Sequence, residues 1–506
     1  MSSRSAVLRG VVWCGPVLVV EIVALCVGLG RTPQRADDEG TYVAQAWSSL
    51  HSGALAHYTY WYDHPPAGWM QLALWFGATG ALARHQSAVL AGREAVVTAT
   101  LAATVLTWLL TRRLGGSPVA ATVAAAVFAI SPLAVAFHRM VYLDDLAVPW
   151  VLLAAVLVTA RHRQLPAWAG AAAACAVAVL TKETTVLVVP FLAWVAAQRG
   201  HPAVRRTAAG VAVPLFVLLV AVYPVSAAIK DELLPGAGHV SLLGSAWFQV
   251  AGREAGGSVL DATSDTARTL ASWWSLDAPF VVAGLAAAVL ATARQRLRPI
   301  AVLVLGHVAV ALRPGGYLPV PFVVVLLPFG AVLVALVVEG GLRPWLRHDR
   351  RFPRSLTRAM AAGTVLAVVA VGAFWVPSAT QGLRWLTTAD ADRPMRSAER
   401  WLAAHVGRHA VVVVDDAMWL DLVRAGRDPD DVVWFHKLDS DPEVRRRTDD
   451  GRRVDYVVTT VSVREDLPHL PLVRAAVRRA VLERRFGSGE DRVDVWRVAR
   501  RTGGRA

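Results

Sequence analysis

The sequence lacks several residues and motifs that commonly indicate function. It contains no asparagine, so it has no N-x-S/T glycosylation sequon. Its three cysteines, Cys14, Cys26 and Cys175, all lie in apolar runs, which excludes a disulfide framework and a CxxC metal or redox site. No HExxH, His-x-His, GxxxxGK[ST] or GxGxxG motif occurs. The sequence therefore predicts neither a metal site nor a nucleotide pocket.

Charged residues are also scarce, at 18% of the 506 residues, whereas 55% are hydrophobic and the mean hydropathy is +0.44. This composition excludes a single water-soluble globular domain. Apolar runs close to the length that spans a bilayer recur as far as Val376. They predict a polytopic α-helical membrane protein with about eleven transmembrane helices, at residues 11–29, 88–110, 118–135, 146–160, 165–181, 184–198, 208–228, 278–292, 299–312, 318–338 and 359–376.

The distribution of arginine predicts the orientation of these helices. With a cytoplasmic N-terminus, the cytoplasmic segments contain 18 basic residues against two acidic ones, whereas the opposite side has 10 basic and 14 acidic residues before the polar tail. The net charge of +14 is therefore explained by loops beside anionic lipid, and it does not indicate a nucleic-acid partner. The basic residues include only three lysines, which suggests a high-GC bacterium. We expect a multi-pass protein of a bacterial plasma membrane.

The chain divides into a transmembrane core, residues 1–376, and a polar tail, residues 377–506. The core has two long outer loops, at residues 30–87 and 229–277, and loops of this length are usually functional or separately folded. An odd number of crossings places the tail outside the cell.

The tail is predicted to fold as a small extracytoplasmic α/β domain. β-type runs predict strands at residues 411–414, 431–435, 454–460 and 491–496. The amphipathic runs WLDLVRAG and PLVRAAVRRAVLERRFG predict helices, the second ending at Gly487. Asp415 and Asp416 follow the first strand, where α/β proteins bind ligands, but we favour capping of the next helix.

Ionisable residues gather at three outer helix ends. Such groups can converge on one cavity at the membrane surface. The alternative is a set of solvated loop residues, with acids that cap a helix beginning near Gly40. The residues are Asp37, Asp38 and Glu39 after the first helix, Arg139, Asp144 and Asp145 in the next outer loop, and Lys182 with Glu183. By contrast Glu21 lies in the middle of the first helix, where we expect an interhelical contact.

Four runs in the core, DDEGTYVAQAW, YDHPPAGW, LTKET and RPGGYLPVPFVVVLLP, follow the expected helices in this order. Together they resemble the family 39 type of membrane glycosyltransferase, which includes the protein O-mannosyltransferases and the lipid A aminoarabinose transferases. The resemblance covers residues 1 to about 376 and implies a C-type glycosyltransferase fold. It implies sugar transfer from a polyprenyl-phosphate donor to a cell-envelope acceptor hydroxyl, on a glycan, lipid or protein, in contact with membrane lipids.

In the family that the chain resembles, an aspartate of the first outer loop is the catalytic base. The Asp-Glu-x-x-Tyr pattern falls on Asp38, Glu39 and Tyr42. Asp38 is therefore the expected base, although a neighbouring carboxylate, above all Glu39, stays an alternative. An inverting transfer needs one carboxylate to accept the proton of the acceptor hydroxyl, and the leaving phosphate needs no general acid. Expected acceptor-contacting or orienting residues are Asp37, Tyr42, Asp144 and Asp145.

A departing phosphate needs positive charge or hydrogen-bond donors around it. The expected donor-phosphate ligands are Lys182, Arg139, His64, Arg313 and Tyr317. His64 stands where some family members have lysine, so a pH-dependent phosphate contact and a structural hydrogen bond are both open. No cofactor is expected, but some C-type transferases use a divalent cation, so such an ion stays open.

Two other classes of function compete with the transferase. A transporter or lipid flippase is expected to show inverted repeats and charges at the membrane midplane, and the sequence has no clear internal repeat. A membrane-anchored sensor or scaffold would bind a ligand through the outer α/β domain, but eleven helices are far more than an anchor needs. The clustering of ionisable residues at outer helix ends favours chemistry at the membrane surface.

Overall fold

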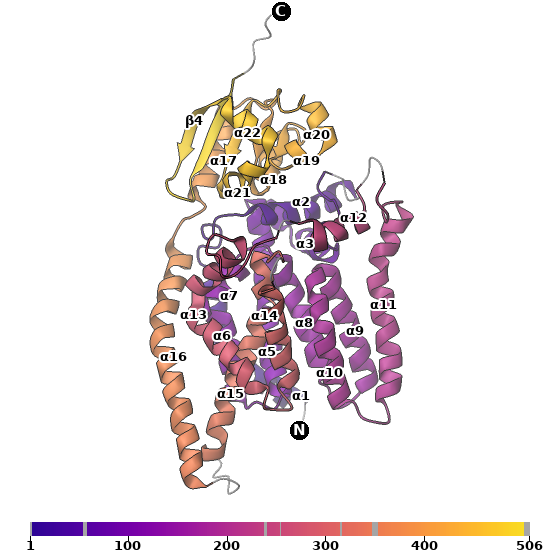
Figure 1. Ribbon diagram of the computed structural model, residues 1–506, viewed down its shortest axis with the longest axis vertical. Coiled ribbons are helices and arrows are strands. Elements are labelled where there is room, and N and C mark those ends of the chain that lie inside the picture. The colour runs from indigo at the N-terminus through magenta and orange to yellow at the C-terminus, as the bar shows by residue number, and fades with distance from the viewer. Residues whose placement is uncertain are drawn as a thin grey trace, which may run out of the picture.

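The computed structural model describes residues 3–53, 58–236, 240–253, 255–313, 316–346 and 353–499. It has three layers: long helices in one bundle, short helices across one end of that bundle, and an α/β domain beyond them (Figure 1). The long-helix layer consists of α1 (Ser3–Cys26), α5 (Ala88–Arg113), α6 (Pro118–Ile130), α7 (Pro132–His138), α8 (Leu143–Val158), α9 (Gln164–Thr181), η1 (Glu183–Val188), α10 (Val189–Arg199), α11 (Arg205–Ile229), α13 (Asp265–Ala291), α14 (Arg298–Ala311), η3 (Val320–Val323), α15 (Leu326–Leu346) and α16 (Arg354–Thr388).

Each of the eleven apolar segments predicted from the sequence coincides with one of these helices or with a consecutive pair. Within the described residues, six helices are long and apolar enough to cross a membrane, or seven if the bent pair α6–α7 is one span. The chain is thus a multi-pass membrane protein, and the count of eleven crossings stays a prediction. Glu21 is buried, and its Oε1 accepts a 2.6 Å hydrogen bond from Thr104 of α5, which confirms the expected interhelical contact.

The bend between α6 and α7 has a local cause. Pro132 lacks the N–H that would continue the first helix, and the Ser131 side chain caps the second by accepting from the Ala134 N–H. The Ser131 hydroxyl also donates to Asp277, at a break inside α13, with an O–O distance of 2.6 Å. The two helix breaks therefore contact each other, and the pair α6–α7 turns by 60°.

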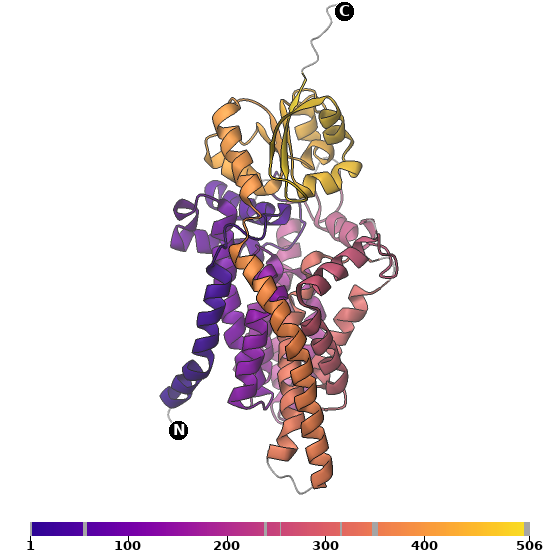
Figure 2. The same cartoon turned by 90° about the vertical axis from the view of Figure 1, so that its left-hand side faces the viewer.

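The two long outer loops fold into short helices that lie across the bundle end facing the α/β domain (Figure 2). The first loop contains Pro65 and Pro66, which fix the backbone just before α3. The short helices are α2 (Asp37–Ser52), α3 (Ala67–Thr79), α4 (Ala81–Arg84), α12 (Leu242–Trp247) and the π-helix η2 (Phe248–Gly252).

The tail forms a five-stranded sheet of order β2-β1-β3-β5-β4. β1 is parallel to β2 and β3, whereas β5 is antiparallel to β3 and β4. α16 continues through residue 376 to Thr388 without a break. The elements that follow are α17 (Arg393–His405), β1 (Val412–Val414), α18 (Asp416–Arg424), β2 (Val432–Trp434), α19 (Lys437–Ser440), α20 (Pro442–Arg447), β3 (Tyr456–Thr459), α21 (Val461–Asp466), η4 (Leu467–His469), α22 (Pro471–Arg478), β4 (Ala480–Phe486) and β5 (Val493–Val498).

One predicted helix of the tail is wrong in its second half. The amphipathic run was expected to be helical up to Gly487, but α22 ends at Arg478 and residues 480–486 form β4. Gly487 and Gly489 have φ values of 72° and 68°, which build the turn between β4 and β5. Pairing with β5 outweighs the local helical pattern, because it satisfies the backbone of an exposed edge strand.

Candidate functional site

The acidic triplet of the first outer loop forms the first turn of α2. Acidic residues are favoured there because the helix dipole is positive at its N-terminus. Consecutive residues of an α-helix point about 100° apart, so the three carboxylates separate. Asp38 is exposed, Asp37 is half-buried, and Glu39 is fully buried.

Glu39 is part of a buried ion pair. Its two oxygens accept from the guanidinium of Arg93 on α5 at 2.8 and 2.7 Å. Oε1 also accepts from the Val141 N–H at 2.9 Å, and Oε2 accepts from the Ala36 N–H at 3.0 Å. These contacts hold α2 against the bundle and turn Glu39 away from the cavity that Asp38 faces.

That cavity has a volume of about 460 Å³ and lies between the short helices and the α/β domain. Of the residues predicted from the sequence, Asp37, Asp38, Tyr42 and His64 line it. Burial, together with the Asp38 carboxylate, raises the pKa of Asp37 well above its usual range. Asp37 and Asp38 are therefore neighbouring carboxylates in different environments. The other lining residues are Thr41, Trp61, Asp63, Val240, Ser241, Gly244, Ser245, Phe248, Gln249, Arg253, Asp416, Phe435, His436 and Asp466.

Arg253 and Asp63 were missed in the sequence. Arg253 is the only lysine or arginine among the described residues that line the cavity, and its guanidinium lies 4.3 Å from the ring centroid of Tyr317. Asp63 receives a hydrogen bond from Gln45, and burial raises the pKa of its carboxyl group. A signal for Asp63 existed, since it directly precedes His64 in the YDHPP run, whereas a lone arginine in a long loop gives none.

His64 is oriented by two charged residues that follow α9. Lys182 Nζ lies 3.0 Å from His64 Nε2, and His64 Nδ1 lies 3.0 Å from Glu183 Oε2. Lysine can only donate and a carboxylate can only accept. These contacts therefore assign an imidazole that accepts at Nε2 and donates at Nδ1. Three predicted residues, His64, Lys182 and Asp144, thus come together, with Lys182 Nζ 3.9 Å from Asp144.

The pKa values in this group follow from the contacts. Burial alone would lower the pKa of Lys182, but the carboxylates of Glu183 and Asp144 outweigh it and raise that pKa. Burial would raise the pKa of Glu183, yet His64 and Lys182 lower it to about 2. Burial raises the pKa of Asp144 to about 6 against the attraction of Lys182. The Lys182 side chain is therefore kept as a charged ammonium group next to His64.

Seven predicted residues do not line the cavity: Glu39, Lys182 and Asp144, described above, Tyr317, whose ring contacts Arg253, and Arg139, Asp145 and Arg313. Arg139 is buried and donates to the carbonyl oxygens of Ala24, Leu25 and Val27 at the end of α1, at 2.7 to 3.1 Å. There it compensates the unpaired carbonyls of a helix C-terminus. Asp145 accepts from His138 at 2.5 Å, and Arg313 is exposed. Arg139 was expected to bind phosphate, but its hydrogen-bond partners among the described residues are backbone carbonyls.

The α/β domain forms one wall of the cavity. Asp415 caps α18 by accepting from the Ala417 N–H at 2.9 Å, as the sequence predicted. Asp416 also reaches the cavity: its Oδ2 accepts from the Thr41 hydroxyl at 2.7 Å, and its buried Oδ1 has no hydrogen-bond partner within the described residues. Burial raises the pKa of Asp416 well above its usual range. This tail carboxylate is thus part of the site.

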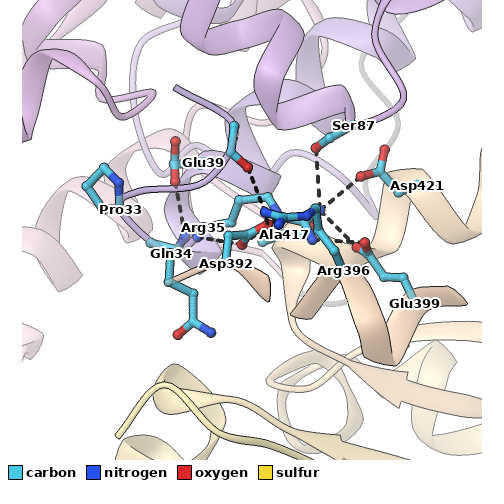
Figure 3. Close-up of polar contacts among 12 residues, drawn as sticks. Pro33, Gln34, Arg35, Glu39, Ser87, Asp392, Arg396, Glu399, Ala417 and Asp421 are labelled. Carbon is cyan, nitrogen blue, oxygen red and sulfur yellow. Dashed lines mark hydrogen bonds and ion pairs between the residues drawn. The ribbon is translucent and has the colours of Figure 1, made fainter. Parts of the chain in front are cut away.

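A buried arginine connects the domain to the start of α2 (Figure 3). Arg35 lies two residues before Asp37, and its guanidinium contacts Asp392 at 3.1 Å, Glu399 at 2.8 Å and Asp421 at 2.9 Å. Burial alone would lower the pKa of Arg35, but the three carboxylates raise it well above its usual range. These contacts fix the position of α2 relative to α17 and α18. Among the described residues, no group of three His, Cys, Asp or Glu side chains could hold a metal ion.

Comparison with known proteins identifies similar folds. The family model described as dolichyl-phosphate-mannose-protein mannosyltransferase matches residues 63–227. ArnT from Cupriavidus metallidurans bound to undecaprenyl phosphate is 15% identical, with a TM-score of 0.60 and coverage of 98% of both chains. This chain has a C-type glycosyltransferase fold. The resemblance to family 39-type membrane glycosyltransferases is confirmed.

A second solved structure shares the glycosyltransferase fold. The oligosaccharyltransferase AglB from Archaeoglobus fulgidus, in complex with an inhibitory peptide and a dolichol-phosphate, is 13% identical, with a TM-score of 0.54. The match covers 92% of this chain and 72% of that one. A comparison with curated proteins gives no match. The aligned regions of both solved structures include residues of the helix bundle and of the α/β domain.

Proposed function

We propose that this chain transfers a sugar from a polyprenyl-phosphate donor to an acceptor hydroxyl at the outer face of a bacterial plasma membrane. The observation that best supports this function is the separation of the acidic triplet. Glu39 is fixed by Arg93, whereas Asp38 faces a polar cavity at the end of an apolar helix bundle. A carboxylate at the end of the bundle can contact both a lipid-linked donor and a water-soluble acceptor.

In the proposed reaction Asp38 is the base. The acceptor oxygen attacks the anomeric carbon, its proton passes to Asp38, and the bond to the polyprenyl phosphate breaks with inversion. Asp37 has a raised pKa, so it is suited to remain protonated and to hydrogen-bond a substrate oxygen. Glu39 is assigned a positioning role, because both of its oxygens are already bonded.

The cationic side of the cavity is assigned to the donor phosphate. We propose Arg253 as its ligand, with the Tyr317 ring positioning the guanidinium. Both ring nitrogens of His64 are already bonded, to Lys182 and Glu183, so His64 is assigned the role of holding the Lys182 ammonium near the phosphate. The fold neighbours bound to undecaprenyl phosphate and dolichol-phosphate support a polyprenyl-phosphate donor.

The proposed orientation places the α/β domain outside and the N-terminus in the cytoplasm. The short helices of both long loops and the α/β domain lie at one end of the bundle (Figure 1). The basic connections between helices lie at the other end, in agreement with the positive-inside rule. Lipid-linked donors, which carry no nucleotide, can reach the outer leaflet. This agrees with a cavity at the bundle end next to the α/β domain.

The test uses the purified full chain in nanodiscs with a panel of radiolabelled polyprenyl-phosphate sugars and cell-envelope extract. Asp38→Asn should lower transfer by about 10²- to 10⁴-fold, whereas Asp265→Asn, an exposed carboxylate outside the cavity, should retain it. Full activity in Asp38→Asn would remove that residue as the base. No turnover with any donor, together with saturable uptake of another ligand, would favour a transporter instead.

A further inference from the structure

A second polar cavity, of about 400 Å³, lies at the end of the bundle away from the α/β domain. Four arginines and two glutamines account for its polar lining: Arg113, Arg161, Arg199, Arg296, Gln198 and Gln295. Sugar transfer at the Asp38 cavity uses none of these residues. We call this the arginine cavity.

The direction of α5 places the arginine cavity at the far end. The Ala88 N–H, at the start of α5, donates to Asp421 of the α/β domain at 2.7 Å. Arg113 ends the same helix of 26 residues, which spans about 39 Å at 1.5 Å per residue. The arginine cavity and the Asp38 cavity are therefore separated by the length of the bundle.

Four separate segments supply the four arginines. Arg113 ends α5, Arg161 lies between α8 and α9, Arg199 ends α10, and Arg296 lies between α13 and α14. Arg199 Nη1 donates to the Arg113 carbonyl at 3.1 Å, which joins two of these segments. The cavity is thus assembled by the tertiary fold and is not a run of adjacent basic residues.

Within the described ranges, none of the four arginines forms an ion pair with a carboxylate, and no acidic residue lines the cavity. Like charges around one concavity repel each other. A bound anion removes this repulsion, and a guanidinium can donate two parallel hydrogen bonds to a phosphate. The arginine cavity is therefore suited to an anion with several negative charges.

An apolar cavity of about 550 Å³ lies between α9, α10 and α11, and α10 also carries Gln198 and Arg199 of the arginine cavity. Gly200 directly follows Arg199 and packs closely against Trp168 and Arg205: an added Cβ would lie 2.9 Å from the Trp168 ring and 3.0 Å from Arg205 Cβ. Trp168 and Arg205 line the apolar cavity. Arg199 of the arginine cavity lies within one helical turn of Ala196 and Ala197, which line the apolar cavity on the same helix. An amphiphilic anion could therefore place its charged group among the arginines and its apolar part in the apolar cavity.

We propose that the arginine cavity binds the two phosphate groups of an anionic phospholipid of the cardiolipin type, with its acyl chains along the apolar cavity. Basic pockets between transmembrane helices on the positive side of a membrane protein suit such headgroups. This site is independent of the proposed sugar transfer.

The test measures cardiolipin binding to the full chain in neutral detergent by native mass spectrometry. The double variant Arg161→Gln, Arg296→Gln removes two charges from the cavity and should weaken binding about 30-fold. The control, Arg354→Gln with Arg358→Gln, removes two exposed charges from the same end on α16 and should change binding less than about threefold. Both variants should keep the unfolding temperature of the parent in neutral detergent.

Several outcomes would overturn the proposal. Equal losses in the two double variants would show general attraction of a basic face, and unchanged binding in the cavity variant would exclude the arginines. Tighter binding of undecaprenyl phosphate than of cardiolipin would assign the cavity to a prenyl carrier. Displacement of the lipid by equimolar inorganic pyrophosphate would assign it to a soluble polyanion. Equal binding of phosphatidylcholine would remove the role of charge.

Discussion

The hydroxyl of Thr41 donates a 2.7 Å hydrogen bond to Oδ2 of Asp416, across 375 positions of sequence. Thr41 lies three residues after Asp38 in α2, and Asp416 begins α18 of the α/β domain. Beside this contact, Gly40 packs directly against the backbone of Asp416. The α/β domain therefore forms part of the cavity that Asp38 faces, so changes at this interface should affect catalysis.

Gly40→Ala should separate α2 from α18. An added Cβ would lie 2.1 to 2.2 Å from backbone atoms of Asp416 and Ala417, which cannot move as a side-chain end can. We expect loss of most transfer activity and faster protease cleavage between α16 and α17. The matched control is Gly77→Ala in α3, where the added Cβ meets only Leu50 at 3.7 Å. Equal activity of the two variants would contradict the close-contact argument.

Arg35→Met should leave Asp392, Glu399 and Asp421 without their buried cation. Removal of one partner from a buried ion pair costs about 3–5 kcal/mol, so we expect a lower unfolding temperature and release of the α/β domain in limited proteolysis. Arg400→Met removes an exposed arginine from α17 and should unfold as the parent does. An unchanged Arg35→Met protein would show that apolar contacts alone hold the domain.

Glu39→Gln and Asp38→Asn should separate stability from catalysis. Glu39→Gln breaks a fully buried pair with Arg93, so it should destabilise the fold by about 3–5 kcal/mol. Asp38 is exposed, and its substitution should leave the unfolding temperature close to that of the parent. Paired measurements of unfolding temperature and transfer rate check both expectations. Activity loss without destabilisation in Glu39→Gln would instead make it a candidate base.

Glu183 should make the folded protein less stable as the pH falls below 4.5. Burial raises its pKa, but His64 and Lys182 outweigh this effect and lower it to about 2, from an ordinary value of 4.5. The contribution is therefore present above pH 4.5 and is lost as the pH falls from 4.5 towards 2. Its size is reduced by solvent, because the side chain is 43% exposed.

Glu183→Gln should make unfolding temperature less dependent on pH in this window than it is in the parent. Glu443→Gln, at an exposed position in α20, serves as the control and should leave the pH profile unchanged. Identical profiles for the parent and Glu183→Gln would show that His64 and Lys182 do not hold the Glu183 carboxylate in the folded protein.

The class of the fold and much of the site could be predicted from local pattern. Apolar runs predicted the helical segments because a helix that contacts lipid must be apolar over about 20 residues. The acidic triplet and the YDHPP run identified Asp37, Asp38, Tyr42 and His64, which do line the cavity. The hydrophobic pattern failed for β4, because strand pairing with β5 is a contact between two segments that no single segment reveals.

The sequence by itself determined a multi-pass helical membrane protein with acidic residues at the start of α2, since both follow from composition and neighbouring residues. Only the tertiary structure decided that Asp37 and Asp38 line the cavity whereas Glu39 does not. Arg93 binds Glu39 across 54 positions, and Asp416 and Arg253 enter the site from distant segments. Such contacts depend on how helices pack, because burial and charge pairing act between residues that the sequence keeps far apart.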